Sequence, residues 1–329
     1  MKAYWFEKAG EAADVLQSGE MPQAEPGPDE VTVRMICSAV NPTDVKRRET
    51  GRELGRFDRI IPNNDGSGII EAVGVNVDPA RIGGRVWIFG AQAMRPHGTA
   101  AEYCTLPARL ARPLSDNQSF ADGACLGVPA VTASHGIFAD GPMEGKTILI
   151  TGGSGRVGRY AVQMAHLAGA TVIATAGTAE KVAEIKDLGA DHALNYKSDN
   201  IVHAVKEVTS GKGVDRILDV AFGANIMDAP ELVRDNGVIA SYSSDGMPRP
   251  EIPFTALMYK NVLIRPFAIF GLQQKAQAAA FAHVEGLLNE SRLRHKVGHE
   301  FAFDEMIAAN EAIAKGDAGG VCLVRIADE

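Results

Sequence analysis

The fold is decided by the stretch Thr-Ile-Leu-Ile-Thr-Gly-Gly-Ser-Gly-Arg-Val-Gly at residues 147–158. It opens as a short apolar run, passes through clustered glycines, and continues with apolar residues at helical spacing. Glycines allow a tight turn and let a pyrophosphate approach the backbone, while a helix N-terminus presents N–H groups and a positive dipole end. The G-x-G-x-x-G pattern therefore predicts a dinucleotide site formed by Gly153, Ser154, Gly155, Arg156, Val157 and Gly158.

The residues after this stretch alternate between predicted strands and helices. Short apolar runs predict strands over residues 171–176, 192–196, 217–220, 238–242 and 261–267. Most of them are separated by helical stretches, such as 181–188 with its apolar residues on one helical face. This alternation is typical of a doubly wound parallel sheet, so we predict an α/β fold for this part of the chain.

The first 110 or so residues have a different pattern. Predicted strands at residues 1–7, 31–40, 68–73, 85–89 and 100–106 are separated by Gly, Pro and an Asn-Asn-Asp-Gly cluster, without intervening helical periods. We expect a compact, mostly antiparallel β unit here. Near the end of the chain, a helix over 304–315 and a strand over 321–326 are expected to fold back onto this first domain.

Composition limits the classes of partner. A length of 329 residues suits about two domains, and 46 % hydrophobic with 22 % charged residues excludes a disordered chain. The net charge of −8 disfavours nucleic acid or an anionic membrane as the main partner. With no long apolar run and a charged, non-signal-like start, we expect a cytoplasmic protein.

Cysteine and histidine spacing predicts no metal site. The 4 cysteines stand far apart without a C-x-x-C pair, and no H-E-x-x-H motif occurs among the 8 histidines.

Taken together, these motifs resemble those of the zinc-independent quinone oxidoreductases, ζ-crystallin-like members of the medium-chain dehydrogenase/reductase superfamily. The resemblance rests on the β unit, the Gly-Lys-Thr before the glycine-rich stretch, Gly-Ala-Asp-His-Ala-Leu-Asn-Tyr at 189–196, and Gly-Val-Asp at 213–215. It covers essentially the whole chain. It implies a GroES-like catalytic domain over 1–123 completed by 268–329, a Rossmann domain over 124–267, and NADPH as cofactor.

The resemblance also implies individual site residues. Asn41 matches the asparagine that the family keeps beside nicotinamide and substrate, where its amide would donate to a carbonyl oxygen as negative charge develops. Asp44, three residues later, is the second candidate catalytic residue. Thr132 matches a position that binds the carboxamide, and Tyr196 matches an adenosine-side tyrosine. A turn asparagine, a helix threonine and a core aromatic are the ordinary structural alternatives for Asn41, Thr132 and Tyr196.

Topology adds candidates at the strand ends, because ligands bind outside the carboxyl ends of parallel strands. Phe222, Ser241 and Tyr242 follow such ends. Phe267 and Phe270 would form a wall for the nicotinamide, or belong to the core.

Cofactor choice is predicted from the end of the second strand. A site for a free ribose 2′-hydroxyl would place an acid there, whereas this chain has Gly177 and Thr178, with Lys181 one helical turn later. We therefore predict NADPH, with Lys181 facing the 2′-phosphate rather than serving only as a solvated helix residue. Glu180 is a counter-signal, and we expect it to point away.

Zinc chemistry finds no support in the segments where zinc-dependent relatives keep a Cys and a Gly-His-Glu motif. These segments read Cys37–Asp44 and Asn63–Gly68, and neither contains a histidine. Without a Lewis acid, alcohol oxidation loses its driving chemistry. The tyrosines that line the acceptor pocket in several relatives fall near Lys46 and Glu53, inside a basic segment over 46–59. This segment is either a solvated surface or a feature that favours an anionic acceptor such as an acyl thioester of coenzyme A.

We therefore predict an NADPH-dependent, metal-free reductase that transfers hydride to quinones or similar conjugated carbonyls. Two alternatives stay open: reduction of an enone or enoyl-thioester double bond, and a non-catalytic, crystallin-like NADPH-binding protein. We also expect a homodimer through the apolar strand 261–270, which relatives pair with its symmetry mate. Pro266 suggests an edge position for this strand because proline cannot donate to a ladder.

Overall fold

The computed structural model describes residues 1–316 and 319–328, and it divides into two compact units. The first unit comprises residues 1–128 and the segment from Glu285 onward, and the second comprises Pro129–Val284. The expected boundaries lay at 123/124 and 267/268, so both divisions fall later along the chain. The second shift has a local cause, because α11 (Gln274–Asn289) packs on α4 (Gly127–Phe138) through a contact between His283 and Phe138 with ring centroids 4.5 Å apart.

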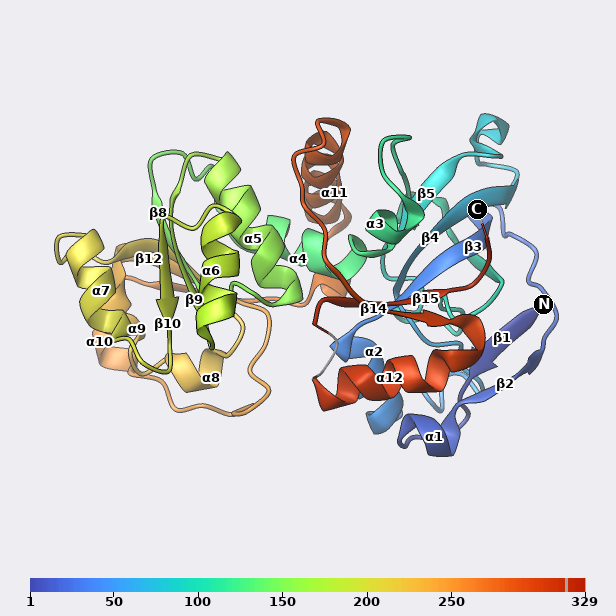
Figure 1. The fold of residues 1–329 in the computed structure, drawn as a ribbon, viewed down its shortest axis with the longest axis horizontal. Coiled ribbons are helices and arrows are strands. Elements are labelled where there is room, and N and C mark those ends of the chain that lie inside the picture. The colour runs from blue at the N-terminus through green and yellow to red at the C-terminus, as the bar shows by residue number, and fades with distance from the viewer. Residues whose placement is uncertain (317–318, 329) are drawn as a thin grey trace. The chain divides into compact units, whose positions relative to one another are not determined.

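The second unit is built on a six-stranded parallel sheet of order β10-β9-β8-β11-β12-β13 (Figure 1). Its strands are β8 (Thr147–Ile150), β9 (Thr171–Ala176), β10 (His192–Asn195), β11 (Val214–Asp219), β12 (Val233–Ser241) and β13 (Leu263–Pro266). The order reverses between β8 and β11, as in a doubly wound Rossmann fold. The prediction of an α/β fold is therefore confirmed.

Helices connect these strands. They are α5 (Arg156–Leu167), α6 (Ala179–Asp187), α7 (Ile201–Val208), α8 (Phe222–Asn225), α9 (Ala229–Leu232) and α10 (Phe254–Tyr259). The predicted apolar face of α5 is buried through Tyr160, Ala161 and Met164. The central strands are buried as well: Ile148, Leu149 and Ile150 of β8 are at most 1 % exposed. These buried faces explain the continuous apolar runs in the sequence.

The first unit contains a seven-stranded sheet, in the path β14-β15-β3-β4-β5-β7 with β6 on β3. Its strands are β3 (Glu30–Val40), β4 (Asp65–Val73), β5 (Arg85–Ile88), β6 (Tyr103–Pro107), β7 (Ala111–Pro113), β14 (Val297–Ala302) and β15 (Val321–Arg325). All pairs except β14 with β15 are antiparallel. A separate hairpin joins β1 (Lys2–Trp5) to β2 (Gln17–Glu20). The prediction of a mostly antiparallel β unit is confirmed.

The C-terminal tail completes this sheet, as expected. β15 pairs antiparallel with β3, with Leu323 opposite Ala39. Between β14 and β15 lies α12 (Met306–Lys315), which buries Met306, Ala309 and Ile313 in a core cluster of the first unit.

The sequence showed no helical periods between the predicted strands of the first 110 or so residues, so the helices near these strands were not predicted. Short helices α1 (Ala12–Val15) and α3 (Phe120–Ala124) flank its strands, and α2 (Pro42–Thr50) directly follows β3. Pro42 stands at the start of α2, Asp44 accepts the Asn41 backbone N–H at 2.8 Å, and Gly51 ends the helix with φ 63°. Two of the buried residues of α2 are arginines, Arg47 and Arg48, so the helix shows no apolar period in sequence.

None of the helices among the described residues has the length and hydropathy needed to span a membrane.

If the tail is integral to the first sheet, Leu323→Ala will destabilise that unit strongly. Leu323 is 1 % exposed, and truncating such a leucine costs about 2–5 kcal/mol through lost burial and the cavity left behind. Val75→Ala is the control, because Val75 is 89 % exposed and its truncation should stay within about 0.5 kcal/mol. Urea unfolding checks both variants, and equal small effects would contradict the integral role of β15.

Candidate active site

The glycine-rich turn lies where the sequence predicted it, between the end of β8 and the start of α5. Gly155 is the N-cap of α5 and, having no side chain, leaves the first turn without a side-chain cap. A Cβ added at Gly158 would lie 2.2 Å from the Gly152 carbonyl oxygen, so only glycine lets the helix approach the turn this closely. The turn therefore has the close backbone and open helix N-terminus that a pyrophosphate requires.

The end of β9 carries the predicted adenosine-side residues. Thr178 caps α6, with its Oγ1 accepting the Lys181 backbone N–H at 3.3 Å. Tyr196 lies against Gly177, because a Cβ added there would come within 2.7 Å of the tyrosine hydroxyl. Gly177 and Thr178 follow β9, and Tyr196 follows β10, which pairs with β9, so these three residues lie together. The Lys181 side chain is exposed on α6.

Glu180 lies at the start of α6. Its own backbone N–H and then the Thr178 hydroxyl hydrogen-bond its carboxylate and lower the pKa of Glu180. An exposed acid near the N-terminus of α6 therefore lies beside Thr178.

Asp219, at the end of β11, is a buried acid that the sequence reasoning did not single out. Its Oδ1 accepts from the Thr151 hydroxyl at 2.8 Å, the Ala221 backbone N–H at 2.8 Å and the Asn225 amide at 2.9 Å. These bonds join the loops that follow β8 and β11. The only sequence signal was its place at the end of an apolar strand.

The remaining predicted residues of the second unit lie at the following strand ends. Phe222 begins α8, and its backbone N–H donates to the Ser243 carbonyl at 3.1 Å. Ser241 ends β12, and its hydroxyl donates to the same carbonyl at 3.2 Å. Phe222 and Ser241 are therefore both tied to one loop.

Aromatic residues follow β12 and β13. Burial raises the pKa of Tyr242, and its ring lies 6.3 Å from that of Phe267. Phe267 also contacts His135 of α4, with ring centroids 4.9 Å apart, while Thr132 is buried on the same helix. Phe270 lies farther along the chain, in the short turn Ile269–Gly271. The structure thus brings Tyr242 and Phe267 together.

In the first unit, Asn41 and Asp44 belong to a buried polar cluster with Asn64 and Asp65, here called the Asn41–Asp65 cluster. All four residues are at most 2 % exposed. The Asn41 amide Nδ2 donates to Asp65 Oδ2 at 2.7 Å, and the Asn64 amide donates to Asp44 Oδ1. The register of β3 and β4, with Ala39 opposite Asp65, brings these residues to one place.

Two carboxyl groups share this cluster, and burial dominates their titration. Burial raises the pKa of Asp44 to about 6, against hydrogen bonds from Asn41 and Asn64 that lower it. Burial and then the negative charge of Asp44 raise the pKa of Asp65 to about 8. Asn64 and Asp65 were missed as functional candidates because the sequence 63–66 has the composition of a turn.

The residues of the cluster do not fit a zinc ion. Zinc takes thiolate, imidazole and carboxylate ligands. No group of three or more His, Cys, Asp or Glu side chains in the described part of the chain is placed to hold a metal. The amide N–H groups of Asn41 and Asn64 donate to the carboxyl oxygens of Asp65 and Asp44. In a cation site, the electron pairs of these oxygens would face the metal ion instead. Cys37 lies within β3, opposite Ser67.

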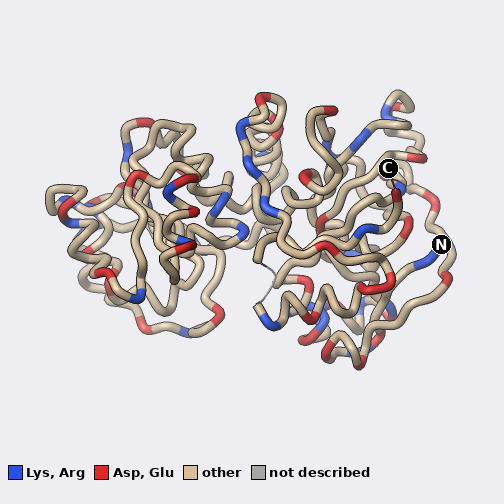
Figure 2. The backbone as a smooth tube through the Cα atoms, in the orientation of Figure 1, with Lys and Arg blue, Asp and Glu red and all other residues tan. Residues whose placement is uncertain are grey.

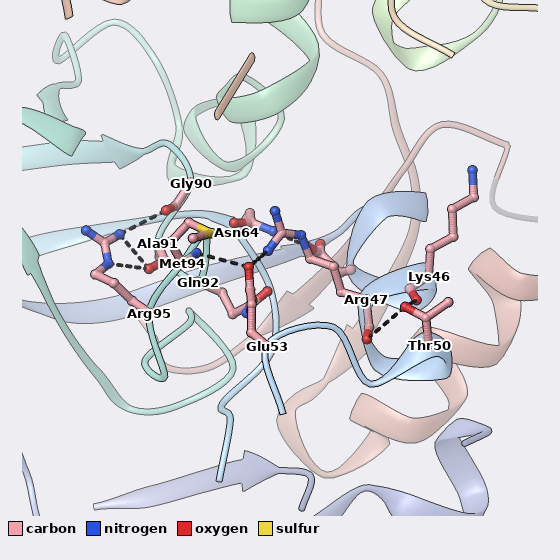
Figure 3. A network of polar contacts seen from close by, with 11 residues as sticks. Lys46, Arg47, Thr50, Glu53, Asn64, Gly90, Ala91, Gln92, Met94 and Arg95 are labelled. Carbon is pink, nitrogen blue, oxygen red and sulfur yellow. Dashed lines mark hydrogen bonds and ion pairs between the residues drawn. The ribbon is translucent and has the colours of Figure 1, made fainter. Parts of the chain in front are cut away.

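In the basic segment 46–59, Arg47 and Arg48 are buried and engaged within the first unit, whereas the other basic residues are exposed. The exposed ones are Lys46, Arg52, Arg56 and Arg59. Arg47 forms an ion pair with Glu53, and both side chains are at most 7 % exposed (Figure 3). Glu53 also accepts from the Gln92 amide at 2.6 Å and the Met94 backbone N–H at 3.2 Å. Arg48 donates to the Gly10 carbonyl. Basic and acidic positions are also interspersed along the backbone (Figure 2).

The Arg47–Glu53 pair gives a test of this network. Glu53→Gln leaves a buried guanidinium without its carboxylate, which should lower the free energy of unfolding by about 3–5 kcal/mol. Glu49→Gln is the control, since Glu49 is 41 % exposed and its contact with Arg48 is long, at 3.9 Å. The double variant Arg47→Met, Glu53→Gln should be less destabilised than the two single changes predict together. Additive losses in urea unfolding would contradict a coupled pair.

Comparisons with known proteins agree with this geometry. The family models for the alcohol dehydrogenase GroES-like domain and the zinc-binding dehydrogenase match residues 27–116 and 157–284. A quinone oxidoreductase from Rattus norvegicus is 27 % identical over 328 residues, covering 97 % of this chain and 96 % of that protein. A 2-methylene-furan-3-one reductase from Solanum lycopersicum is 31 % identical, over 61 % of this chain and 53 % of that protein.

Among solved structures, a mycobacterial quinone oxidoreductase has a TM-score of 0.87 at 25 % identity, covering 99 % of this chain and 100 % of that one. One family model matches part of the first unit and the other matches most of the second. The chain belongs to the medium-chain dehydrogenase/reductase superfamily, in its zinc-independent quinone oxidoreductase group, and it is an oxidoreductase that uses a nicotinamide cofactor.

Proposed function

We propose that this oxidoreductase uses NADPH to reduce quinones or similarly conjugated carbonyls. The observation that carries the proposal is the Asn41 amide, buried and held by Asp65 at 2.7 Å in a cluster that does not suit zinc. An oriented amide N–H stabilises negative charge that develops on an oxygen, without a Lewis acid. A quinone is already electrophilic, so this stabilisation is sufficient for hydride transfer to it. Oxidation of an alcohol would need a metal to lower the pKa of the hydroxyl group.

The second unit would hold the cofactor, which supplies the hydride when bound. The turn 153–158 and the N-terminus of α5 would bind the pyrophosphate, and Tyr196 with Gly177 would contact the adenosine. We assign Lys181 to the 2′-phosphate, Thr132 to the carboxamide and the remaining strand-end residues to the nicotinamide end. Those residues are Phe222, Ser241, Tyr242, Phe267 and Phe270.

Asn41 and Asp44 would have separate roles. One N–H of the Asn41 side chain is donated to Asp65, which leaves the other for the acceptor oxygen. Asp44 accepts the Asn41 backbone N–H at 2.8 Å, so it fixes the start of α2 from which the amide projects.

Reduction of a conjugated carbon–carbon double bond is the second candidate. The tomato relative, named a 2-methylene-furan-3-one reductase, favours it. The two reactions differ in where the hydride goes: to the quinone system in one, and to the β-carbon of an enone in the other, with a proton added to the α-carbon.

An acceptor panel with purified protein separates these proposals. We expect steady NADPH oxidation with 1,2-naphthoquinone and little with enones or enoyl thioesters. The reverse order would favour the double-bond reductase. NADPH binding without turnover of any acceptor would favour a non-catalytic, crystallin-like protein.

Cofactor choice is tested with Lys181→Ala. A charge-assisted contact with the 2′-phosphate contributes roughly 1.5–3 kcal/mol, or about 10–150-fold in affinity. The Michaelis constant for NADPH should rise at least several-fold while that for NADH stays nearly unchanged. Lys186→Ala, at an exposed lysine near the other end of α6, is the matched control.

Glu180→Gln tests the opposing charge beside Thr178 and should lower the Michaelis constant for NADPH. A wild-type preference for NADH would contradict the cofactor assignment. An equal loss for both cofactors in Lys181→Ala would make that lysine structural.

We also propose a twofold homodimer through the strand 261–270. β13 ends the six-stranded sheet, as Pro266 indicated, and Leu263 on this edge is 45 % exposed. Phe254 and Tyr259 of the neighbouring α10 are 64 % and 79 % exposed. An exposed apolar edge favours pairing with a second copy.

The expected cytoplasmic location stays a prediction.

Light scattering at micromolar concentration should give the mass of a dimer. Leu263→Lys should shift it toward the monomer, whereas Val75→Lys in the first unit should not. A monomeric wild-type protein would contradict the proposed dimer.

A further inference from the structure

Asp65 has two carboxyl oxygens in very different surroundings. Oδ2 accepts two N–H groups at 2.7 Å, one from the Asn41 amide and one from the Val128 backbone. Oδ1 is buried and has no hydrogen-bond partner among the described residues. The group is also packed against the backbone, because a Cβ added at Gly127 would lie 2.1 Å from both Asp65 Cγ and Oδ1.

The charges around Asp65 favour a neutral carboxyl group. Asp44 is the other carboxyl group of the cluster, and its charge acts on Asp65. The cation that acts on Asp44 is Arg47, whose ion pair is with Glu53. Two buried carboxyl groups without a directly paired cation are costly to ionise together.

The two acids are not equivalent. Asp44 accepts N–H groups on both of its oxygens, from the Asn41 backbone and the Asn64 amide. The two hydrogen bonds that Asp65 accepts at 2.7 Å both fall on Oδ2, and the Gly90 backbone N–H also acts on the carboxyl group and lowers its pKa. Oδ1 has no partner within hydrogen-bond distance among the described residues, so it is the place for a proton. Hydrogen bonding to the charged form therefore favours ionised Asp44 and neutral Asp65.

We propose that Asp65 is a positioning residue that carries a proton on Oδ1 and, through Oδ2, fixes the Asn41 amide for the reaction. The inference rests on the proposed function in the role that it gives to Asn41. The neutral form keeps the hydrogen bond to Asn41 without placing a second negative charge near an oxygen on which charge develops. Ionised Asp65 would oppose that charge and slow hydride transfer.

Asp65→Asn mimics the neutral acid, because the amide oxygen can take the place of Oδ2 and the NH₂ group that of protonated Oδ1. Asp65→Leu removes the acceptor. We expect Asp65→Leu to lower kcat at least tenfold with an unchanged Kd for NADPH, and Asp65→Asn to rescue most of that loss. The wild-type kcat should fall as pH rises through about 8, the pKa of Asp65, and Asp65→Asn should lose this alkaline limb.

A second readout does not depend on activity. The folded state binds the Asp65 proton more tightly than the unfolded state, since burial raises the pKa from 3.8 to about 8. The stability that this group contributes is present below the unfolded pKa and is lost as pH rises through the folded one. The Tm of the wild type should therefore fall relative to that of Asp65→Asn as pH rises from about 4 to about 8.

Glu71→Gln is the matched control, because Glu71 is an exposed acid on the same strand β4. The difference in Tm between wild type and Glu71→Gln should not change over this pH range. Parallel Tm curves for wild type and Asp65→Asn would overturn the protonated state. A full alkaline limb in Asp65→Asn, or no rescue of the Asp65→Leu loss, would overturn the positioning role. A wild type without quinone turnover would contradict the proposed function, while the Tm comparison would still decide the state of Asp65.

Discussion

The hydrogen bonds to Asp65 Oδ2 are the contacts on which the rest of the first unit's site depends. They join β4 to the buried residue that precedes α2 and to the backbone of the half-buried Val128. Buried polar groups are stable only when their partners are in place, so the cluster requires the strand register that sets Ala39 opposite Asp65. A shift of this register would leave the carboxyl group and the Asn41 amide unpaired.

The same cluster would let a fold shared with zinc-binding dehydrogenases carry out the proposed reduction without zinc. Fold alone does not determine chemistry, and the residues at the site do. Here the cluster consists of amides and carboxyl groups, in which the Asn41 amide donates to Asp65 and the Asn64 amide donates to Asp44. The second unit retains the glycine-rich turn, whose close approach to Gly152 depends on glycine at Gly158.

The parts of the structure that were predictable from sequence are those with a strong local pattern. The glycine-rich turn, the parallel strands and the returning C-terminal strand each carry apolar periods or glycine spacing that the structure confirms. Helix α2 was missed because its buried positions include arginines, which stay inside through the Arg47–Glu53 ion pair and the Arg48 bond to Gly10. Asn64 and Asp65 were missed because pairing between distant residues, and not the local sequence, turns them from a loop motif into a buried cluster.

The central claim is that reduction by this protein depends on its own amide and carboxyl groups and not on a metal. The direct measurement is NADPH oxidation with 1,2-naphthoquinone before and after chelator treatment, with the metal content of the same samples determined by mass spectrometry. The account predicts undiminished turnover by protein that holds far less than one metal ion per chain. Activity that is lost on chelation and restored by zinc would contradict it.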